Sequence, residues 1–469
     1  MNETTAWRAS ASVLAPAIAR QDITARAAVE AVLARIDACN PEANALVEVM
    51  HAQARQQADA ADAKQTRGEA LGPLHGVPIT IKVNVDVQGH ATTDGVPLLK
   101  DNLAQSDSPL VQSLREAGAI IVGRSNTPAF SVRWFTDNDL HGRTLNPFDA
   151  GVTPGGSSGG AAAAVALGMG AIAHGNDYGG SIRYPAWACG VVGLRPTVGR
   201  IPSYKASAPN RILSNQMMSV QGPLTRCVAD ARLALAVMAQ GSPTDPGWNP
   251  VPLTFADAQQ PVRVAMMARH PAYDVDPSVE AAVRQAAQWL SAAGYAIEEV
   301  QAPRFEEGAA LWNQLVQDDM RRGAQAAIEA HAGAGTRNAL HGYMANLPGL
   351  DRDQTLDAYA ERFNILREWG EFMARYPLIL MPNSWQRQFP IDADQRGDDA
   401  VKALLQAQAP LLGTAMMGLP GLSVPTGLAQ GLPTGVQLVA WRYREDQALA
   451  AGEVIERAAG YDVLRALGV

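Results

Sequence analysis

The hydrophobic pattern of the chain changes between helix-like and strand-like stretches. Residues 22–65 carry apolar side chains three and four positions apart with few helix breakers, which predicts helix. Residues 108–124, SPLVQSLREAGAIIVGR, predict a helix, a tight Ala-Gly turn and a strand, and residues 276–300 repeat this order. Units of this kind are typical of α/β folds.

The strand-like pattern is clearest in residues 72–95, which are rich in β-branched side chains. Within this stretch Val77, Ile79 and Ile81 alternate with Thr80 and Lys82, which predicts one apolar and one polar strand face. Such a lysine lies either on a solvated edge or in the interior, and the pattern alone leaves both open. Near the end of the chain, residues 419–441 predict two strands joined by a Gly/Pro turn, and residues 444–460 predict a closing helix.

The best candidate for a linker is residues 241–261, which are rich in proline, glycine and polar residues. This segment separates a glycine-rich first half from a helix-rich second half. We expect it to be a surface connection inside one fold rather than a true domain boundary.

Composition and charge narrow the class of protein. The chain has 469 residues, of which 47% are hydrophobic and 18% charged, and this is globular composition. The net charge of −8 without a long basic run argues against nucleic acid as a partner. Residues 1–22 lack a basic leader, and no apolar run is long enough to span a bilayer, so we expect no membrane partner.

Cysteine and histidine usage adds two expectations. The three cysteines, Cys39, Cys189 and Cys227, are too sparse for a disulfide framework and favour a reducing cytoplasm. The eight histidines form no HExxH motif, and no CxxC motif is present, so no metal site is predicted.

The first candidate for chemistry is the hexapeptide GGSSGG at residues 155–160. It could be a plain turn, a phosphate cradle, a nucleophile elbow centred on Ser158, or a place where backbone meets substrate. A P-loop requires Lys-Ser/Thr after its second glycine, and here alanine follows. An elbow requires a preceding strand, whereas residues 145–154 predict a loop.

A third serine, Ser181, follows another glycine pair in the segment DYGGS at residues 177–181. Consecutive free N–H groups at residues 178–181 could form a nest for a developing oxyanion, although a turn is an equal alternative. A serine nucleophile needs a base. His174 is near in sequence but not obviously placed, and Lys82 qualifies if burial keeps its amine neutral.

Four segments together resemble the amidase signature family of serine hydrolases. They are GPLHGVPITIKVN, GRTLNPFDAGVTPGGSSGGAAAAVALG, GNDYGGSIRYPAWACGVVGLRPT and the late GLPGLSVPTG…GLPTGVQLV. The resemblance extends over essentially the whole chain, is densest from residue 72 to 200 and is weakest from 240 to 410. It implies one α/β domain over residues 1–469, with a mixed, twisted central β-sheet covered by helices on both faces. The expected parts are N-terminal helices 1–70, a signature core 71–240, a variable part 241–410 that shapes the substrate pocket, and closing strands and helix 411–469.

The resemblance also implies the catalytic residues. Matched position by position, Lys82 is the base, Ser157 is the serine in a cis peptide bond that relays protons, and Ser181 is the nucleophile. The backbone of Tyr178, Gly179 and Gly180 matches the oxyanion hole of the family. No metal or organic cofactor is implied.

The sequence departs from the common family pattern near these residues. Val83 stands where aspartate is usual, Ala129 where glutamate is frequent, and Tyr178 where a small or β-branched residue is common. Residues 380–385, LMPNSW, also differ from the usual strand end. The segment FSVRWFTDN aligns with a pocket-lining run of the family. Its Trp134 and Phe135, together with Trp385, are candidates for an aromatic substrate pocket, with ordinary core packing as the alternative.

The resemblance implies hydrolysis of a carboxamide through an acyl-enzyme, with anilides, carbamates and esters as chemically adjacent substrates. The expected partner is a small amide-like molecule, and a homodimer is compatible with these expectations. The alternative is an amidotransferase component that works on charged tRNA within a larger complex, against which the acidic charge balance argues.

Overall fold

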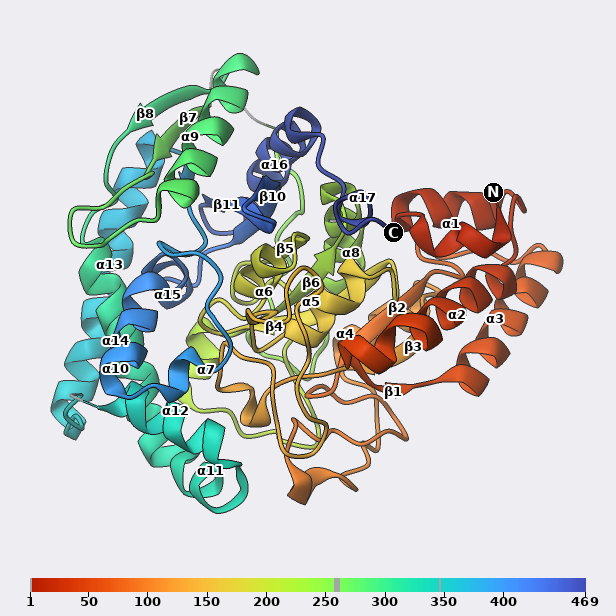
Figure 1. The fold of residues 1–469 in the computed structure, drawn as a ribbon, viewed down its shortest axis with the longest axis horizontal. Coiled ribbons are helices and arrows are strands. Elements are labelled where there is room, and N and C mark those ends of the chain that lie inside the picture. The colour runs from red at the N-terminus through yellow and green to blue at the C-terminus, as the bar shows by residue number, and fades with distance from the viewer. Residues whose placement is uncertain (1, 257–261, 346) are drawn as a thin grey trace.

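The structure is a computed structural model that describes residues 2–256, 262–345 and 347–469. Within these residues, eleven strands pair into one sheet (Figure 1) in the order β1-β3-β2-β4-β6-β5-β10-β11-β9-β7-β8. The strands are β1 (Leu46–Val49), β2 (Pro78–Lys82), β3 (Ile120–Ser125), β4 (Ile172–Asp177), β5 (Val192–Arg195), β6 (Val220–Thr225), β7 (Arg263–Met266), β8 (Ala296–Glu299), β9 (Leu378–Met381), β10 (Gly421–Ala429) and β11 (Leu432–Ala440).

The sheet is mixed, as predicted. Strand β2 runs parallel to β3 and β4, and β7 runs parallel to β8 and β9. The remaining neighbours are antiparallel, including the β10–β11 hairpin. The helices are α1 (Ala11–Ala19), α2 (Ala25–Ala43), α3 (His51–Thr66), α4 (Pro109–Glu116), α5 (Gly159–Ala166), α6 (Arg183–Ala188), α7 (Leu213–Met218), α8 (Val228–Met238), α9 (Pro277–Ala292), α10 (Phe305–Gly323), α11 (Gln325–His331), α12 (Ala334–Met344), α13 (Arg352–Arg375), α14 (Asp398–Ala407), α15 (Ala409–Met416), α16 (Glu445–Ala459) and α17 (Val463–Ala466).

Helices cover both faces of the sheet and bury its apolar side chains. On one face, Ile79 and Ile81 of β2 join the cluster that includes α4, α8, α9 and α16. On the other face, the α10, α13 and α15 side chains pack against β9, while α2 and α5 pack against β3 and β4. The predicted α/β fold is therefore confirmed, and its core lies on both sides of β2.

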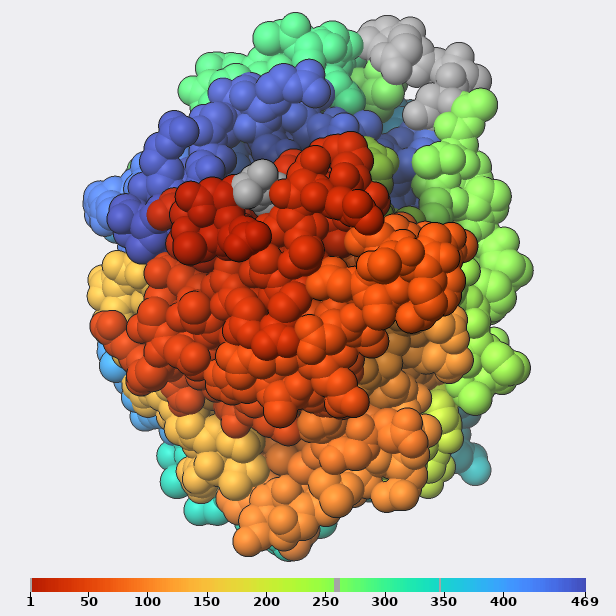
Figure 2. Space-filling view, turned by 90° about the vertical axis from the view of Figure 1, so that its right-hand side faces the viewer, coloured from red at the N-terminus to blue at the C-terminus, as the bar shows by residue number. Residues whose placement is uncertain are grey.

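The two ends of the chain meet on one side of the molecule. Figure 2 shows the N-terminal helices in red beside the C-terminal segment in blue. The Arg8 guanidinium donates to the backbone oxygen of Val469 over 2.8 Å. Within the described residues, no helix is both long enough and apolar enough to cross a membrane.

Two parts of the sequence-based prediction need correction. The stretch 22–65 is not continuous helix, because α2 ends at Ala43, the next residue Asn44 is in a left-handed conformation, and β1 follows before α3. The Asn40 side chain accepts from the N–H groups of Ala45 and Leu46 and so holds this exit from the helix. The stretch 72–95 contains a single five-residue strand, β2, with turns on both sides.

The predicted linker 241–261 lies in part outside the described residues, which omit 257–261. Strands that precede it, β1 to β6, and strands that follow it, β7 to β11, belong to the same sheet. Both halves of the chain therefore build one central layer.

Candidate active site

Lys82 stands at the end of β2 and is fully buried. Its Nζ donates to Ser157 Oγ over 2.7 Å, to Asn176 Oδ1 over 2.7 Å and to Ser158 Oγ over 3.2 Å. The sheet brings these groups together, because β2 lies beside β4, which carries Asn176. Of the two locations that the strand pattern left open, the structure therefore supports the interior.

Burial lowers the pKa of Lys82 to about 7, although the negative charges of Asp94 and Asp177 act in the opposite direction. An ammonium group removed from water loses solvation that its neighbours do not fully replace. A large fraction of Lys82 is therefore the neutral amine at neutral pH. A neutral amine at this position can accept a proton from the Ser157 hydroxyl.

The hexapeptide at residues 155–160 is a tight passage that leads into α5, and its Gly156–Ser157 peptide bond is cis. A Cβ atom on Gly156 would collide with the carbonyl oxygen of Arg133, and one on Gly160 would collide with the backbone of Asn126. These glycines are needed because neighbouring backbone approaches too closely for a side chain. The hexapeptide is therefore a packed element that holds Ser157 beside Lys82.

Ser181 lies just before α6 and is 9% exposed. Its carbonyl oxygen accepts from the N–H of Ser158 over 3.2 Å, which ties the two serine-bearing segments together. Ser157 and Ser181 both line the same cavity. The three residues expected from the family resemblance thus meet at one place, although they come from three separate segments.

The loop before Ser181 presents several backbone N–H groups. The N–H of Gly180 donates to Asp177 Oδ1 over 2.9 Å, so this amide is already paired. Within the described residues, the N–H groups of Gly179 and Ser181 have no hydrogen-bond acceptor. Among the described residues, two N–H groups of this loop are therefore without an acceptor, whereas that of Gly180 points toward a carboxylate.

Asp177 is a buried anchor of this loop that sequence reasoning missed. Its carboxylate accepts from Arg183 Nε over 2.9 Å and from Arg195 Nη1 over 3.1 Å. Burial alone would raise the pKa of Asp177, but the two guanidinium groups hold it below its usual range. The signal available in the sequence was the spacing DYGGSIR, which places the carboxylate six residues before Arg183.

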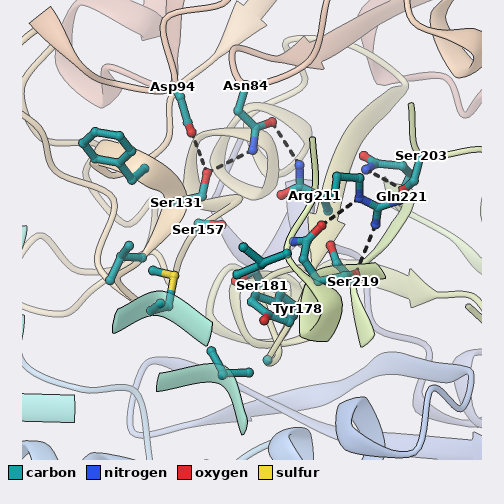
Figure 3. A pocket seen from close by; sticks show the side chains of 18 of the residues that line it. Asn84, Asp94, Ser131, Ser157, Tyr178, Ser181, Ser203, Arg211, Ser219 and Gln221 are labelled. Carbon is teal, nitrogen blue, oxygen red and sulfur yellow. Dashed lines mark hydrogen bonds between the residues drawn. The ribbon is translucent and has the colours of Figure 1, made fainter. Parts of the chain in front are cut away.

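The cavity over the two serines has a volume of about 260 Å³, and Figure 3 shows part of its polar lining. Its apolar lining includes Trp134, Tyr178, Trp312, Met320, Tyr343 and Leu405. In the polar lining, Asn84 donates to Ser131 Oγ over 2.9 Å, and Ser131 Oγ donates to Asp94 Oδ1 over 2.8 Å. Lys205 and Arg211 also line the cavity. The cavity can accept an apolar, flat group next to a polar one.

Of the three residues proposed for an aromatic pocket, the structure places Trp134 in the cavity lining and the other two outside it. Trp134 lines the cavity, and its Nε1 donates to the carbonyl oxygen of Gly179 over 3.1 Å. Phe135 does not line this cavity and stacks on Phe389 with ring centroids 6.3 Å apart. Trp385 is also absent from its lining, because it is fully buried and stacks on Tyr273 at 5.9 Å. The last two residues are core packing.

Two further cavity residues, Trp312 and Tyr343, were not predicted. They lie on α10 and α12, in the part of the chain where the family resemblance is weakest. No local motif marks them, because helical tryptophan and tyrosine residues most often serve ordinary packing.

His174, the rival base, is unsuited to proton transfer at neutral pH. It is buried in β4, and its Nε2 is hydrogen-bonded with Gln221 Oε1 at 2.8 Å. Burial lowers the pKa of His174 to about 3. The geometry therefore favours Lys82 over His174 as the group that exchanges protons with the serines.

Comparison with known proteins shows which family and which proteins the chain is similar to. The family model described as Amidase matches residues 27–449. An indoleacetamide hydrolase from Bradyrhizobium diazoefficiens is 44% identical to the chain over 456 residues, which cover 97% of this chain and 87% of that protein. An acylamidase from Rhodococcus erythropolis is 32% identical and covers 97% of this chain and 95% of that protein. A glutamyl-tRNA(Gln) amidotransferase component from Synechococcus sp. is 34% identical and covers 93% of this chain and 94% of that protein. Among solved structures, a bacterial aryl acylamidase of the amidase signature family superposes with a TM-score of 0.85 at 25% identity, covering 98% of both chains.

Proposed function

Because the chain belongs to the amidase signature family and hydrolyses carboxamide bonds, we propose that Ser181 is its nucleophile, Ser157 its proton relay and Lys82 its base. The observation that carries this assignment is the 2.7 Å contact between Lys82 Nζ and Ser157 Oγ at the base of the cavity that Ser181 also lines. A buried amine with a pKa of about 7 suits general base catalysis near neutral pH.

In acylation, neutral Lys82 accepts the proton of Ser157 while Ser157 Oγ takes the proton of Ser181 Oγ. The Ser181 oxygen forms a bond to the carbonyl carbon, and the carbonyl π electrons move to the oxygen. As the oxyanion re-forms the carbonyl and the C–N bond breaks, Ser157 delivers its proton to the leaving nitrogen and takes a proton back from Lys82, which becomes the neutral amine again. Water, deprotonated along the same route, attacks the acyl-enzyme and releases the acid and Ser181.

The oxyanion of the tetrahedral intermediate is assigned to the free N–H groups of the loop before the nucleophile. Those of Gly179 and Ser181 have no other acceptor among the described residues, whereas that of Gly180 is paired with Asp177. Preorganised N–H donors of this kind stabilise negative charge as it develops.

We further propose that the acyl group is an aryl-substituted acetyl group and that the substrate is a primary amide of the indoleacetamide class. Trp134, Trp312 and Tyr343 give the cavity an aromatic side, which favours a flat apolar ring. The 44% identical relative, an indoleacetamide hydrolase, supports the same class. Anilides, carbamates and esters are related substrates that the same donors could serve.

A second candidate is a component of an amidotransferase, favoured by the 34% identity to a glutamyl-tRNA(Gln) amidotransferase component. It predicts that a partner chain and tRNA co-purify with this chain and that hydrolysis of a free arylacetamide is slow. The aromatic lining of the cavity and the net charge of −8 favour the first candidate.

The test is a substrate screen with variants of the two candidate serines. The purified protein should hydrolyse indole-3-acetamide and phenylacetamide faster than propionamide. Ser181→Ala should lose at least about 10³-fold of the rate while remaining folded, because covalent catalysis is lost. A sulfonyl fluoride should label Ser181. Label on Ser158, together with an inactive Ser158→Ala variant, would instead establish the nucleophile elbow.

A further inference from the structure

We propose that Trp312, on α10, is a positioning residue that aims the Gly179 N–H at the oxyanion. This inference rests on the proposed function, because it assumes that Ser181 attacks a carbonyl next to this loop. The indole of Trp312 is 7% exposed, and its Nε1 donates to the carbonyl oxygen of Tyr178 over 2.8 Å.

The physical reason is the planarity of the peptide unit. The carbonyl of Tyr178 and the N–H of Gly179 belong to the same rigid plane and point in opposite directions. A donor that holds the carbonyl therefore fixes the direction of the N–H. Among the described residues the Gly179 N–H has no acceptor of its own, so the Trp312 bond is the polar contact that orients this unit.

The neighbouring peptide units show how differently each one is held. The carbonyl of Gly179 accepts from Trp134 Nε1 over 3.1 Å, and the N–H in the same plane donates to Asp177. That unit is held at both ends and has no N–H to offer. The carbonyl of Gly180 accepts from the N–H of Tyr184 over 2.8 Å, which leaves the N–H of Ser181 free.

Packing adds to this restraint. A Cβ atom on Gly179 would collide with Cζ2 of Trp312, so the indole lies directly against the loop backbone. The indole also packs edge-on against the Tyr178 ring, with centroids 5.8 Å apart. A glycine pair has wide backbone freedom, and without the indole the 178–179 unit could rotate. Because Trp312 also lines the cavity, one side chain touches both the acyl pocket and the oxyanion loop.

The experiment removes the N–H with the least change of shape. Trp312→Phe keeps an aromatic ring, and Trp312→benzothienylalanine keeps the bicyclic outline with sulfur in place of the N–H. The matched control is Trp369→Phe, because Trp369 is a fully buried tryptophan whose Nε1 donates to the carbonyl of Pro303 over 2.7 Å, outside the cavity lining. Each variant is measured for kcat and KM on propionamide and phenylacetamide, for affinity toward phenylacetaldehyde, and for Tm.

Loss of one oxyanion donor costs about 10²–10³-fold in kcat, and misaiming one should cost about tenfold. We therefore expect both Trp312 variants to lose about tenfold in kcat on both amides, with the KM for propionamide changed less than about twofold. The affinity for phenylacetaldehyde, which forms a tetrahedral adduct with Ser181, should fall by the same factor as kcat/KM for phenylacetamide. Trp369→Phe should change Tm alone.

An unchanged kcat in the benzothienylalanine variant would overturn the proposal, and so would an effect limited to a higher KM for phenylacetamide. Trp312 would then only line the cavity. A fall in kcat without a matching fall in aldehyde affinity would do the same. The Ser181→Ala variant distinguishes failure of the Trp312 proposal from failure of the proposed function. If that variant stays active and the aldehyde still binds, the serine mechanism fails and the positioning role fails with it. If it is inactive, the Trp312 results decide the positioning role alone.

Discussion

Lys82 Nζ lies 2.7 Å from Ser157 Oγ and 3.2 Å from Ser158 Oγ, so the lysine contacts both serines of the hexapeptide but is closer to the first. Ser158 Oγ also donates to the carbonyl oxygen of Asn176 over 3.3 Å. Its hydroxyl therefore ties α5 to β4, whereas Ser157 Oγ is the hydroxyl that lines the cavity with Ser181.

This difference predicts unequal effects of removing the two hydroxyls. Ser157→Ala should lose about 10²–10⁴-fold in kcat, the usual contribution of a positioned proton donor and acceptor. Ser158→Ala should lose at least about tenfold less, because it weakens a tether and one lysine contact. Steady-state kinetics with phenylacetamide on variants of equal Tm measure the ratio. A larger loss in Ser158→Ala would move the relay role to that residue.

The lysine predicts the pH dependence of catalysis. Because the base is the neutral amine, kcat/KM should rise with pH through one ionisation near pH 7 and stay high above it. Lys82→Ala should abolish that ionisation and most of the rate. Lys82→Arg should not restore either, because guanidinium stays protonated.

His174 provides the control for this pH profile. Burial lowers its pKa to about 3, so it carries no charge change near neutrality. A His174→Gln variant should therefore keep the ionisation near pH 7. An ionisation that survives in Lys82→Ala and disappears in His174→Gln would assign the base to the histidine.

The aromatic side chains that line the cavity lead to a prediction about substrate specificity. Tyr343→Ala should lower kcat/KM for phenylacetamide more than kcat/KM for propionamide, because a missing apolar contact is worth about 1–3 kcal/mol of discrimination. Trp385→Phe should leave the ratio of the two kcat/KM values unchanged, since Trp385 packs on Tyr273 away from the cavity. Equal losses on both amides in Tyr343→Ala would mean that Tyr343 supports the fold only.

The sequence predicted those strands and turns that have a clear local pattern of residues. Alternation in residues 77–82 located β2, and the Gly/Pro turn in 419–441 located the β10–β11 hairpin. Strand β1 was missed because it has only four residues and lies between two helices, so its pattern is too short to recognise. The turn from α2 into β1 also depends on a hydrogen bond to the Asn40 side chain.

Sequence motifs could predict the serine-bearing segments of the site. They could not predict the residues that reach the site from segments far away in the sequence. Glycines precede Ser157 and Ser181 because a Cβ atom would collide there with backbone at Gly156 and with the side chains of Trp312 and Leu411 at Gly179 and Gly180, and these glycines are visible in the sequence. Trp312 reaches the Tyr178 carbonyl from a helix far along the chain, and Trp385 faces the core instead of the cavity. Such orientations follow from tertiary packing, for which a single tryptophan carries no signal.

Asp177 forms buried ion pairs with Arg183 and Arg195, so we expect Asp177→Asn to lower the free energy of unfolding. The change leaves Arg183 and Arg195, both fully buried, without their carboxylate. Breaking a buried ion pair by removing one partner costs about 3–5 kcal/mol. Denaturant unfolding should show this loss, and kcat per folded molecule should also fall, because the amide offers one acceptor oxygen where the carboxylate offers two to the Gly180 N–H and the guanidinium groups. Unchanged stability would mean that solvent reaches these guanidinium groups.

The last prediction concerns the cost of keeping Lys82 in the interior. The pKa of Lys82 is about 7 in the folded protein and about 10.4 in an unfolded chain. Between these values the unfolded chain binds a proton that the folded protein does not, so the free energy of unfolding should rise with pH across this window. Above the unfolded pKa, burial of Lys82 takes no proton from the chain and carries no such cost. As pH falls toward the folded pKa, the cost grows and the free energy of unfolding decreases by the same amount.

Comparison with Lys82→Met isolates this contribution, because all other titrating groups are shared by the two proteins. The free energy of unfolding of the wild type minus that of Lys82→Met should increase by about 3 kcal/mol between about pH 7 and about pH 9.5. Denaturant titrations at several pH values measure the difference. A difference that stays flat over this range would mean that the Lys82 pKa is not lowered by folding. The amine would then be protonated at neutral pH and could not serve as the base.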